Sequence, residues 1–92
     1  MKTYIIAYDL NKYESSSDYQ KIINAIKGLG NWTKPLESTW LVKTSSSSSE
    51  IRNYLKQFID NNDELLIINV PNANWATQGI KEDVLDWMHK NI

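Results

Sequence analysis

The feature that most constrains this chain is a helical stripe of apolar residues in its second half. The stripe follows the i, i+3, i+4, i+7 and i+8 positions and comprises Ile51, Tyr54, Leu55, Phe58 and Ile59. This spacing places the side chains on one face of an α-helix, which must be buried against other elements. Ser47 and Glu50 have the spacing of a capping box at the start of such a helix. The sequence therefore predicts an amphipathic helix that begins within the serine run Ser45–Ser49 and packs on a core.

Two more helices are predicted on the same grounds. The first has an apolar face formed by Tyr19, Ile22, Ile23, Ile26 and Leu29. It follows a polar loop over Asn11–Ser17, and Ser17 with Gln20 has capping-box spacing at its start. Gly28 and Gly30 are typical of a helix end. The last helix is predicted from apolar residues at helical spacing near the end of the chain, at Ile80, Val84, Trp87 and Met88.

The stretches between these helices are rich in β-branched and aromatic residues, which predicts strands. The first strand is expected over Thr3–Leu10. Residues 31–44 are expected to form a hairpin or bent strand pair, with a turn at 35–37 and a strong strand over Ser38–Thr44. Glu64–Val70 is expected to be a mostly buried central strand, which Pro71 ends.

The order of these elements is β-α-β-β-α-β followed by a helix. It predicts an α+β, ferredoxin-like fold: a four-stranded antiparallel sheet plus a C-terminal helix, in a single domain over residues 1–92. Two helices would cover one face of the sheet. The third helix or a second subunit could cover the other face.

Composition narrows the classes of function. The chain has no cysteine, which rules out disulfides and thiolate metal sites and favours an intracellular, cytoplasmic setting. No apolar run approaches the roughly 18 residues of a membrane span. The net charge is −1 and the chain has one arginine, Arg52, so nucleic-acid binding would depend on a local basic patch.

Several short motifs resemble those of a known family. Residues 4–10, Tyr-Ile-Ile-Ala-Tyr-Asp-Leu, resemble the Tyr-Asp-hydrophobic signature of the second CRISPR-associated (Cas-two) protein family. Leu29-Gly30, Ser38–Val42 and Asn62–Ile67 lie where that family has a glycine, a Ser-hydrophobic-aromatic strand and an acidic start to its fourth strand.

The similarity is closer to a divergent branch of small bacterial and phage-borne proteins described as SinR-like or Cas-like. In that branch Tyr8–Lys12, Ser38–Trp40 and Asn62-Asp63 recur, together with a tryptophan in the last helix like Trp87. The resemblance implies a ferredoxin-like homodimer involved in phage defence. It also implies metal-dependent nuclease activity as in some members, or a structural DNA-bridging role as in others. The metal-binding carboxylate that the resemblance implies is Asp9.

Asp9 is therefore the candidate catalytic and metal-binding residue. At the end of a strand, two symmetry-related copies could share one Mg²⁺ and activate water for attack on a phosphodiester. The alternative is structural, because an aspartate just after a strand often accepts backbone hydrogen bonds in a turn. A Ser38–His89 pair is an improbable nucleophile and base, since His89 belongs to the last helix.

Four further residues are candidate binding residues, either for nucleic acid or for a protein partner: Trp32, Lys34, Ser38 and Trp75. Tryptophans stack on unpaired bases, but they are also common in cores and protein interfaces. Trp40 and Trp87 fit core positions, whereas Trp32 and Trp75 lie near turns. The lysines are scattered along the sequence, which favours a core or interface role for the tryptophans.

Two hypotheses follow. In the first, the chain is a dimeric metal-dependent endonuclease or nucleic-acid-bridging protein, with two copies of Asp9 near each other beside a positive groove. In the second, it is a non-catalytic protein-interaction module from a phage or mobile element, with a neutral or acidic surface, exposed tryptophans near Trp75, and an Asp9 engaged in local hydrogen bonds.

Overall fold

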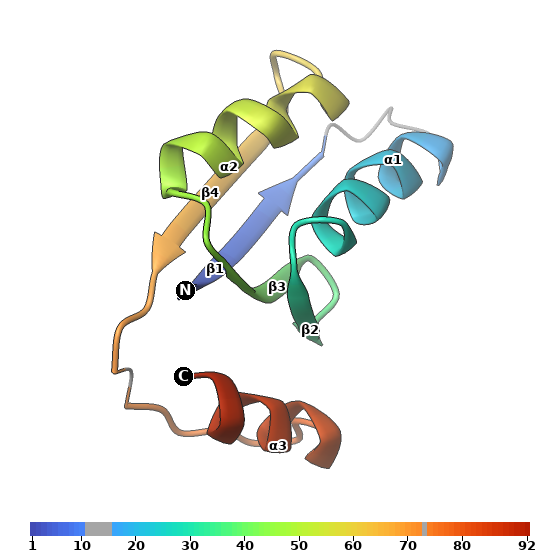
Figure 1. The fold of residues 1–92 in the computed structure, drawn as a ribbon. Helices are drawn as coiled ribbons and strands as arrows, with labels where there is room; N and C mark the ends of the chain where they lie inside the picture. Colours follow the sequence, from blue (N-terminus) through green and yellow to red (C-terminus); the bar gives the residue numbers. More distant parts are fainter. Residues whose placement is uncertain (11–15, 73) are drawn as a thin grey trace.

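The sheet of this protein has four antiparallel strands in the order β2-β3-β1-β4. The computed structural model describes residues 1–10, 16–72 and 74–92 (Figure 1). The strands are β1 Lys2–Asp9, β2 Asn31–Leu36, β3 Thr39–Thr44 and β4 Glu64–Asn69. With the helices between them they form the ferredoxin-like βαββαβ arrangement, followed by a C-terminal helix, as the sequence predicts.

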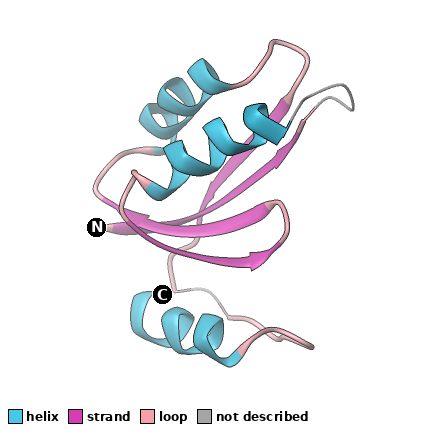
Figure 2. Ribbon diagram, turned by 90° about the vertical axis from the view of Figure 1, so that its right-hand side faces the viewer, coloured by secondary structure: helices cyan, strands magenta, loops and turns pink. Residues whose placement is uncertain are grey.

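Helices lie on both faces of this sheet. The helices α1 Ser16–Lys27 and α2 Ser48–Leu55 cover one face, and α2 continues into a short 3-10 helix, η1 Lys56–Phe58. The C-terminal helix α3 Glu82–Asn91 lies on the opposite face (Figure 2). We call these the helix face and the open face, because α3 covers the second only in part. None of the helices in the described ranges has the length and apolar character needed to cross a membrane.

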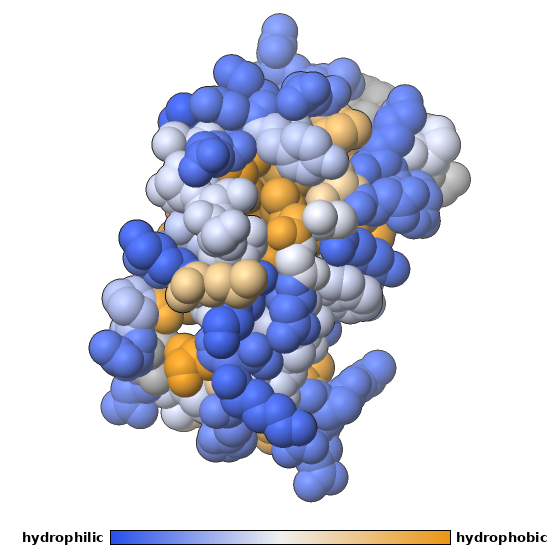
Figure 3. Space-filling model, viewed as in Figure 1, coloured by the Kyte–Doolittle hydropathy of each residue, from blue (hydrophilic) through white to orange (hydrophobic). Residues whose placement is uncertain are grey.

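The main core lies between the sheet and the helices α1 and α2. Alternate residues of β1 point into it, since side chains along a strand alternate between faces. Its largest fully buried side chains are Trp40, Tyr4, Ile6, Ile22, Ile26, Ile51, Leu55 and Val42. Each buried side chain of this size contributes about 1.5–3 kcal/mol through removal of apolar area from water. On this side of the molecule, apolar surface is visible in the seam between α1 and α2, within a largely hydrophilic surround (Figure 3).

A smaller core holds α3 on the open face. It consists of the buried residues Leu41, Val84 and Met88, with half-buried neighbours that include Ile5, Trp75, Ile80 and Trp87. Hydrogen bonds fix the helix in place: the Trp87 indole N–H donates to Asn31 Oδ1 at 2.9 Å, and Thr3 Oγ1 donates to the carbonyl of Asn91 at 2.6 Å.

The capping box predicted for the second helix is confirmed. The backbone N–H of Glu50 donates to Ser47 Oγ at 3.1 Å, and the backbone N–H of Ser47 donates to Glu50 Oε1 at 2.9 Å. The hydrogen bond from the Ser47 backbone N–H to the Glu50 carboxylate, together with one from the Ser47 side chain, holds the pKa of the Glu50 carboxyl below its ordinary value. The first helix begins at Ser16, so Ser17 lies inside it rather than at its cap. The rest of the loop expected over Asn11–Ser17 falls outside the described residues.

Three strand and helix predictions are corrected. β4, expected to be a mostly buried central strand, is an edge strand that pairs with β1 alone, and its residues Glu64, Leu66, Ile68 and Asn69 are exposed. An apolar run shows neither how many neighbours a strand has nor whether both of its faces are covered. The turn expected at 35–37 is shorter, since β2 extends to Leu36 through a bulge between Thr33 and Leu36. Tyr54, expected in the buried stripe of the second helix, is 41% exposed. The helix α2 ends at Leu55, and its buried residues are Ile51 and Leu55.

Candidate functional site

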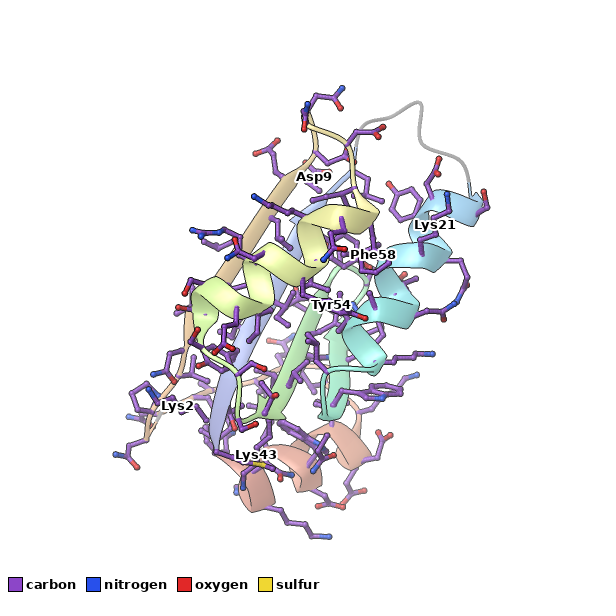
Figure 4. The ribbon with its side chains drawn as sticks, turned by 45° about the horizontal axis from the view of Figure 1, so that its top comes forward. Lys2, Asp9, Lys21, Lys43, Tyr54 and Phe58 are labelled. Carbon is purple, nitrogen blue, oxygen red and sulfur yellow. The ribbon has the colours of Figure 1, made fainter. Side chains whose placement is uncertain are left out.

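Asp9 ends β1 and lies directly opposite Glu64, the first residue of β4, in the antiparallel register. Both side chains are exposed. They border a shallow hollow of about 450 Å³ whose lining also includes Ala7 and Leu66. Figure 4 shows Asp9 at the end of the sheet far from Lys2 and Lys43. The structure therefore joins two carboxylates that are far apart in the sequence.

The Asp9 carboxylate has no hydrogen bond or ion pair within the described part of the chain. Facing a second carboxylate across a strand pair is unfavourable by itself, because like charges directly opposite each other repel. The turn interpretation, in which Asp9 accepts local hydrogen bonds, concerns the loop over residues 11–15, which lies outside the described residues.

As a metal site, the pair meets part of the requirement of Mg²⁺. Mg²⁺ is commonly held by one or two carboxylates, with waters and substrate phosphate oxygens completing its shell. Asp9 and Glu64 supply two such groups from one copy of the chain. Over residues 1–10, 16–72 and 74–92, no cluster of three or more His, Cys, Asp or Glu side chains forms a fuller site. The nearby Asp63 carboxylate already accepts a hydrogen bond from the backbone N–H of Asp60 at 2.8 Å.

Ser38 lies at the same end of the sheet, as expected. Its carbonyl accepts a hydrogen bond from the backbone N–H of Tyr8 at 3.3 Å. The His89 ring lies 5.3 Å from the Trp75 ring, centroid to centroid, with the two planes inclined at 55°, beside the open-face core. His89 therefore sits in a different layer of the molecule from the Ser38 turn, and the structure supports no Ser-His catalytic pair.

The other candidate binding residues separate into two groups. Trp32 and Lys34 lie near each other on β2, where the Lys34 ammonium is 5.4 Å from the centroid of Trp40 and the Trp32 and Trp40 rings are 5.2 Å apart. Trp75 lies on the open face, half buried against α3. The core assignment of Trp40, which is 1% exposed, is confirmed.

Two residues of these candidate sites were not singled out from the sequence: Glu64 and Lys27. Glu64 becomes the neighbour of Asp9 only through the β1–β4 register, which no local pattern specifies. Lys27, at the end of α1, has its ammonium 5.1 Å from the centroid of the Trp32 ring. Gly28 and Gly30 could have indicated the Lys27–Trp32 contact in part, because they mark a short connection between α1 and β2.

The class of protein that this geometry defines is a ferredoxin-like α+β domain. A solved structure described as a hypothetical protein, TT1823 from Thermus thermophilus, is similar to it with a TM-score of 0.66. The two share 18% sequence identity, and the alignment covers 87% of this chain and 94% of that chain. At this identity the similarity shows the fold alone. No protein-family model matches the chain.

Proposed function

We propose that this chain acts in the cytoplasm as a Cas-two-like homodimer with metal-dependent endonuclease activity centred on Asp9. The observation that carries the proposal is the Asp9–Glu64 pair: two exposed carboxylates, face to face, beside a hollow. Asp9 has no hydrogen-bond or ion-pair partner among the described residues.

A second copy would complete the site. Leu66 and Ile68 are 55% and 45% exposed, and both lie on the open face beyond the reach of α3. Their partners in the register are Ala7 and Ile5, so the apolar strip runs toward the Asp9–Glu64 pair. A two-fold axis near the end of this strip would bury it against its own copy and bring the two acidic pairs together.

In this proposal the chain's own residues hold a metal ion and orient it toward the nucleic-acid backbone. Asp9 and Glu64 would be the ligands of a Mg²⁺ ion, which when bound supplies positive charge at the phosphate and an activated water. Leu66 and its copy would exclude bulk water from one side of the hollow. Because Asp9 and Glu64 are exposed, a nucleic-acid backbone could reach them.

The test is cleavage of end-labelled RNA and DNA, single- and double-stranded, with Mg²⁺, Mn²⁺ or EDTA. Asp9→Asn should reduce metal-dependent cleavage at least about 100-fold, because removal of outer-shell partners alone typically costs 10- to 100-fold. Glu64→Gln should have a similar effect. The matched control is Asp86→Asn, which neutralises an exposed carboxylate on α3 and should leave cleavage unchanged.

A stability measurement separates lost function from lost folding. Asp9→Asn removes the like-charge repulsion with Glu64, so this variant should unfold at an equal or slightly higher urea concentration than the parent. Cleavage that persists in Asp9→Asn, or no cleavage with any metal, would reject the nuclease proposal. In the second case the exposed apolar strip of β4 would favour the protein-interaction module instead.

A further inference from the structure

The strongest feature outside the Asp9–Glu64 pair is an aromatic and basic surface along β2. Trp32 is 39% exposed and meets the buried Trp40 edge-on, with ring centroids 5.2 Å apart and planes inclined at 62°. The ammonium of Lys27 lies 5.1 Å from the Trp32 centroid, and that of Lys34 lies 5.4 Å from the Trp40 centroid. Each ring of the pair therefore carries its own lysine. We call Lys27, Trp32 and Lys34 the β2 strip.

The lysines of the β2 strip are not neutralised by neighbours. Within the described residues, no carboxylate lies within 4.0 Å of the ammonium of Lys27 or Lys34. A hollow of about 390 Å³ continues from Lys34, and its charged lining residues are Lys34, Lys81 and Glu37. The β2 strip therefore carries two lysines without a carboxylate partner among the described residues, and the hollow beside it adds one lysine, Lys81, and one carboxylate, Glu37.

A second aromatic pair in the molecule has no lysine over its rings among the described residues, so an exposed ring in this protein is not always paired with a lysine. Tyr54 and Phe58 are also edge-on, at 5.3 Å and 69°, and Tyr54 is 41% exposed. In the part of the chain that the structure describes, no lysine or arginine lies over either ring. Both rings lie on the side of α2 that faces α1 (Figure 4). The two pairs thus match in geometry and each has one exposed ring, but among the described residues only the Trp32–Trp40 pair has lysines over its rings.

We propose that the β2 strip binds single-stranded nucleic acid, with an unpaired base stacked on Trp32 and backbone phosphates on Lys27 and Lys34. Single-strand sites combine an aromatic platform with positive charge that follows the backbone, and both parts are present here. The base replaces the ammonium of Lys27 over the ring, and Lys27 turns to a phosphate. Trp40 holds the Trp32 ring from below. This inference rests on the proposed function for its biological setting, but the strip binds without metal.

The test is binding of fluorescently labelled fifteen-nucleotide oligo(dT) and oligo(U), measured by anisotropy in EDTA so that cleavage cannot occur. Trp32→Ala should weaken binding about 5- to 150-fold, which corresponds to the loss of one stacked base. Trp32→Phe should retain most of the affinity. Lys27→Gln and Lys34→Gln should each lower the slope of log K against log salt by about 0.7, the value for one single-strand phosphate contact.

Two control variants are available in the same molecule. Tyr54→Ala removes an equally exposed ring from the uncharged pair, and Lys56→Gln removes an exposed lysine from η1. Both should leave affinity and salt slope unchanged. Equal losses in Tyr54→Ala and Trp32→Ala, no change in Trp32→Ala, or no measurable binding of either oligonucleotide would each overturn the proposal.

The outcomes of the two proposals are separable. Binding in EDTA that depends on Trp32, without cleavage in any metal, would sustain the β2 strip and reject the nuclease. Cleavage that depends on Asp9, with an affinity that Trp32→Ala does not change, would reject the β2 strip alone. Because Lys27→Gln and Lys34→Gln are surface changes, their salt slopes decide the matter even if Trp32→Ala folds poorly.

Discussion

The two edges of the sheet are built in opposite ways. The outer edge of β2 carries Lys34, Pro35 and a bulge, which are the usual means of preventing an edge strand from pairing with another chain. The edge of β4 has the sequence ELLIIN, without lysine, proline or bulge, and it exposes Leu66 and Ile68. The difference teaches that β2 is protected against strand pairing and presents charge, whereas β4 has neither the protection nor the charge along its exposed apolar residues.

The largest expected effect comes from a substitution at Gly30, directly before β2, which should disturb the pairing of β2 with β3. A Cβ atom there would overlap the backbone carbonyl of Lys43 on β3. Gly30→Ala should therefore destabilise the fold by about 3 kcal/mol, at the upper end for overpacking, because backbone gives way less readily than a side chain. Urea denaturation measures the loss, and hydrogen exchange should accelerate in β2 while β4 stays protected.

Gly28→Ala is the matched control for that experiment. A Cβ atom at position 28 meets only carbonyl oxygens at 3.5 and 3.6 Å, which is ordinary contact. Its stability should change by less than about 1 kcal/mol. If both variants lose equal stability, the close approach of β2 to β3 is not what requires a glycine at position 30.

The next effect concerns the β4 edge and its proposed second copy. Ile68→Lys places a charge on the exposed apolar strip and should raise the dimer dissociation constant about 30-fold, equivalent to about 2 kcal/mol. Sedimentation across a concentration series measures it. Leu36→Lys makes the same change at the other edge, where Leu36 is 58% exposed, and should not alter assembly. A monomeric parent protein, or equal sensitivity of the two edges, would contradict the comparison.

A smaller effect is expected in α2, the helix that packs behind β4. Ser47→Ala removes the side-chain acceptor of the capping box and should cost about 1 kcal/mol in urea unfolding. Ser45→Ala, in the same serine run but outside the box, should cost much less. A full loss in both variants would mean that the serine run, and not the cap, supports the helix.

The smallest effect is a dependence on pH. The hydrogen bonds from Ser47 lower the pKa of Glu50 in the folded protein, so the charged carboxylate stabilises the fold above its unfolded pKa. That contribution should disappear as the pH falls below about 4.3 and through the lowered value. The stability difference between the parent and Glu50→Gln should accordingly narrow in acid. A difference that stays constant from pH 7 to acid would contradict the capping role of the carboxylate.

The sequence predicts local features of this molecule well and pairings between distant segments poorly. The capping box at Ser47 and Glu50 is a contact between near neighbours, and it forms as expected. The order of elements predicts the ferredoxin-like fold. The edge position of β4 depends instead on which strands lie beside it, and a run such as Leu65–Ile68 contains no such information.

The candidate sites were predicted only in part for the same reason, because their residues come from segments that are distant in the sequence. Asp9 stands out by its position at the end of a strand, but its neighbour Glu64 is set by the β1–β4 register. The lysines are scattered in the sequence, which argued against a role in binding bases. Lys27 and Lys34 nevertheless meet the Trp32–Trp40 pair, because α1 turns directly into β2 and places its last residue over that strand.

The hydrogen bond from Thr3 to Asn91 joins residues 88 positions apart and has a consequence for the order of folding. Closing a loop of that length in an unfolded chain is entropically costly. Once β1 and β4 are paired, only the connection over residues 70–81 has to close, which lowers the cost by about 1.8 kcal/mol. We therefore expect docking of α3 to be the last step in assembly and the first to reverse.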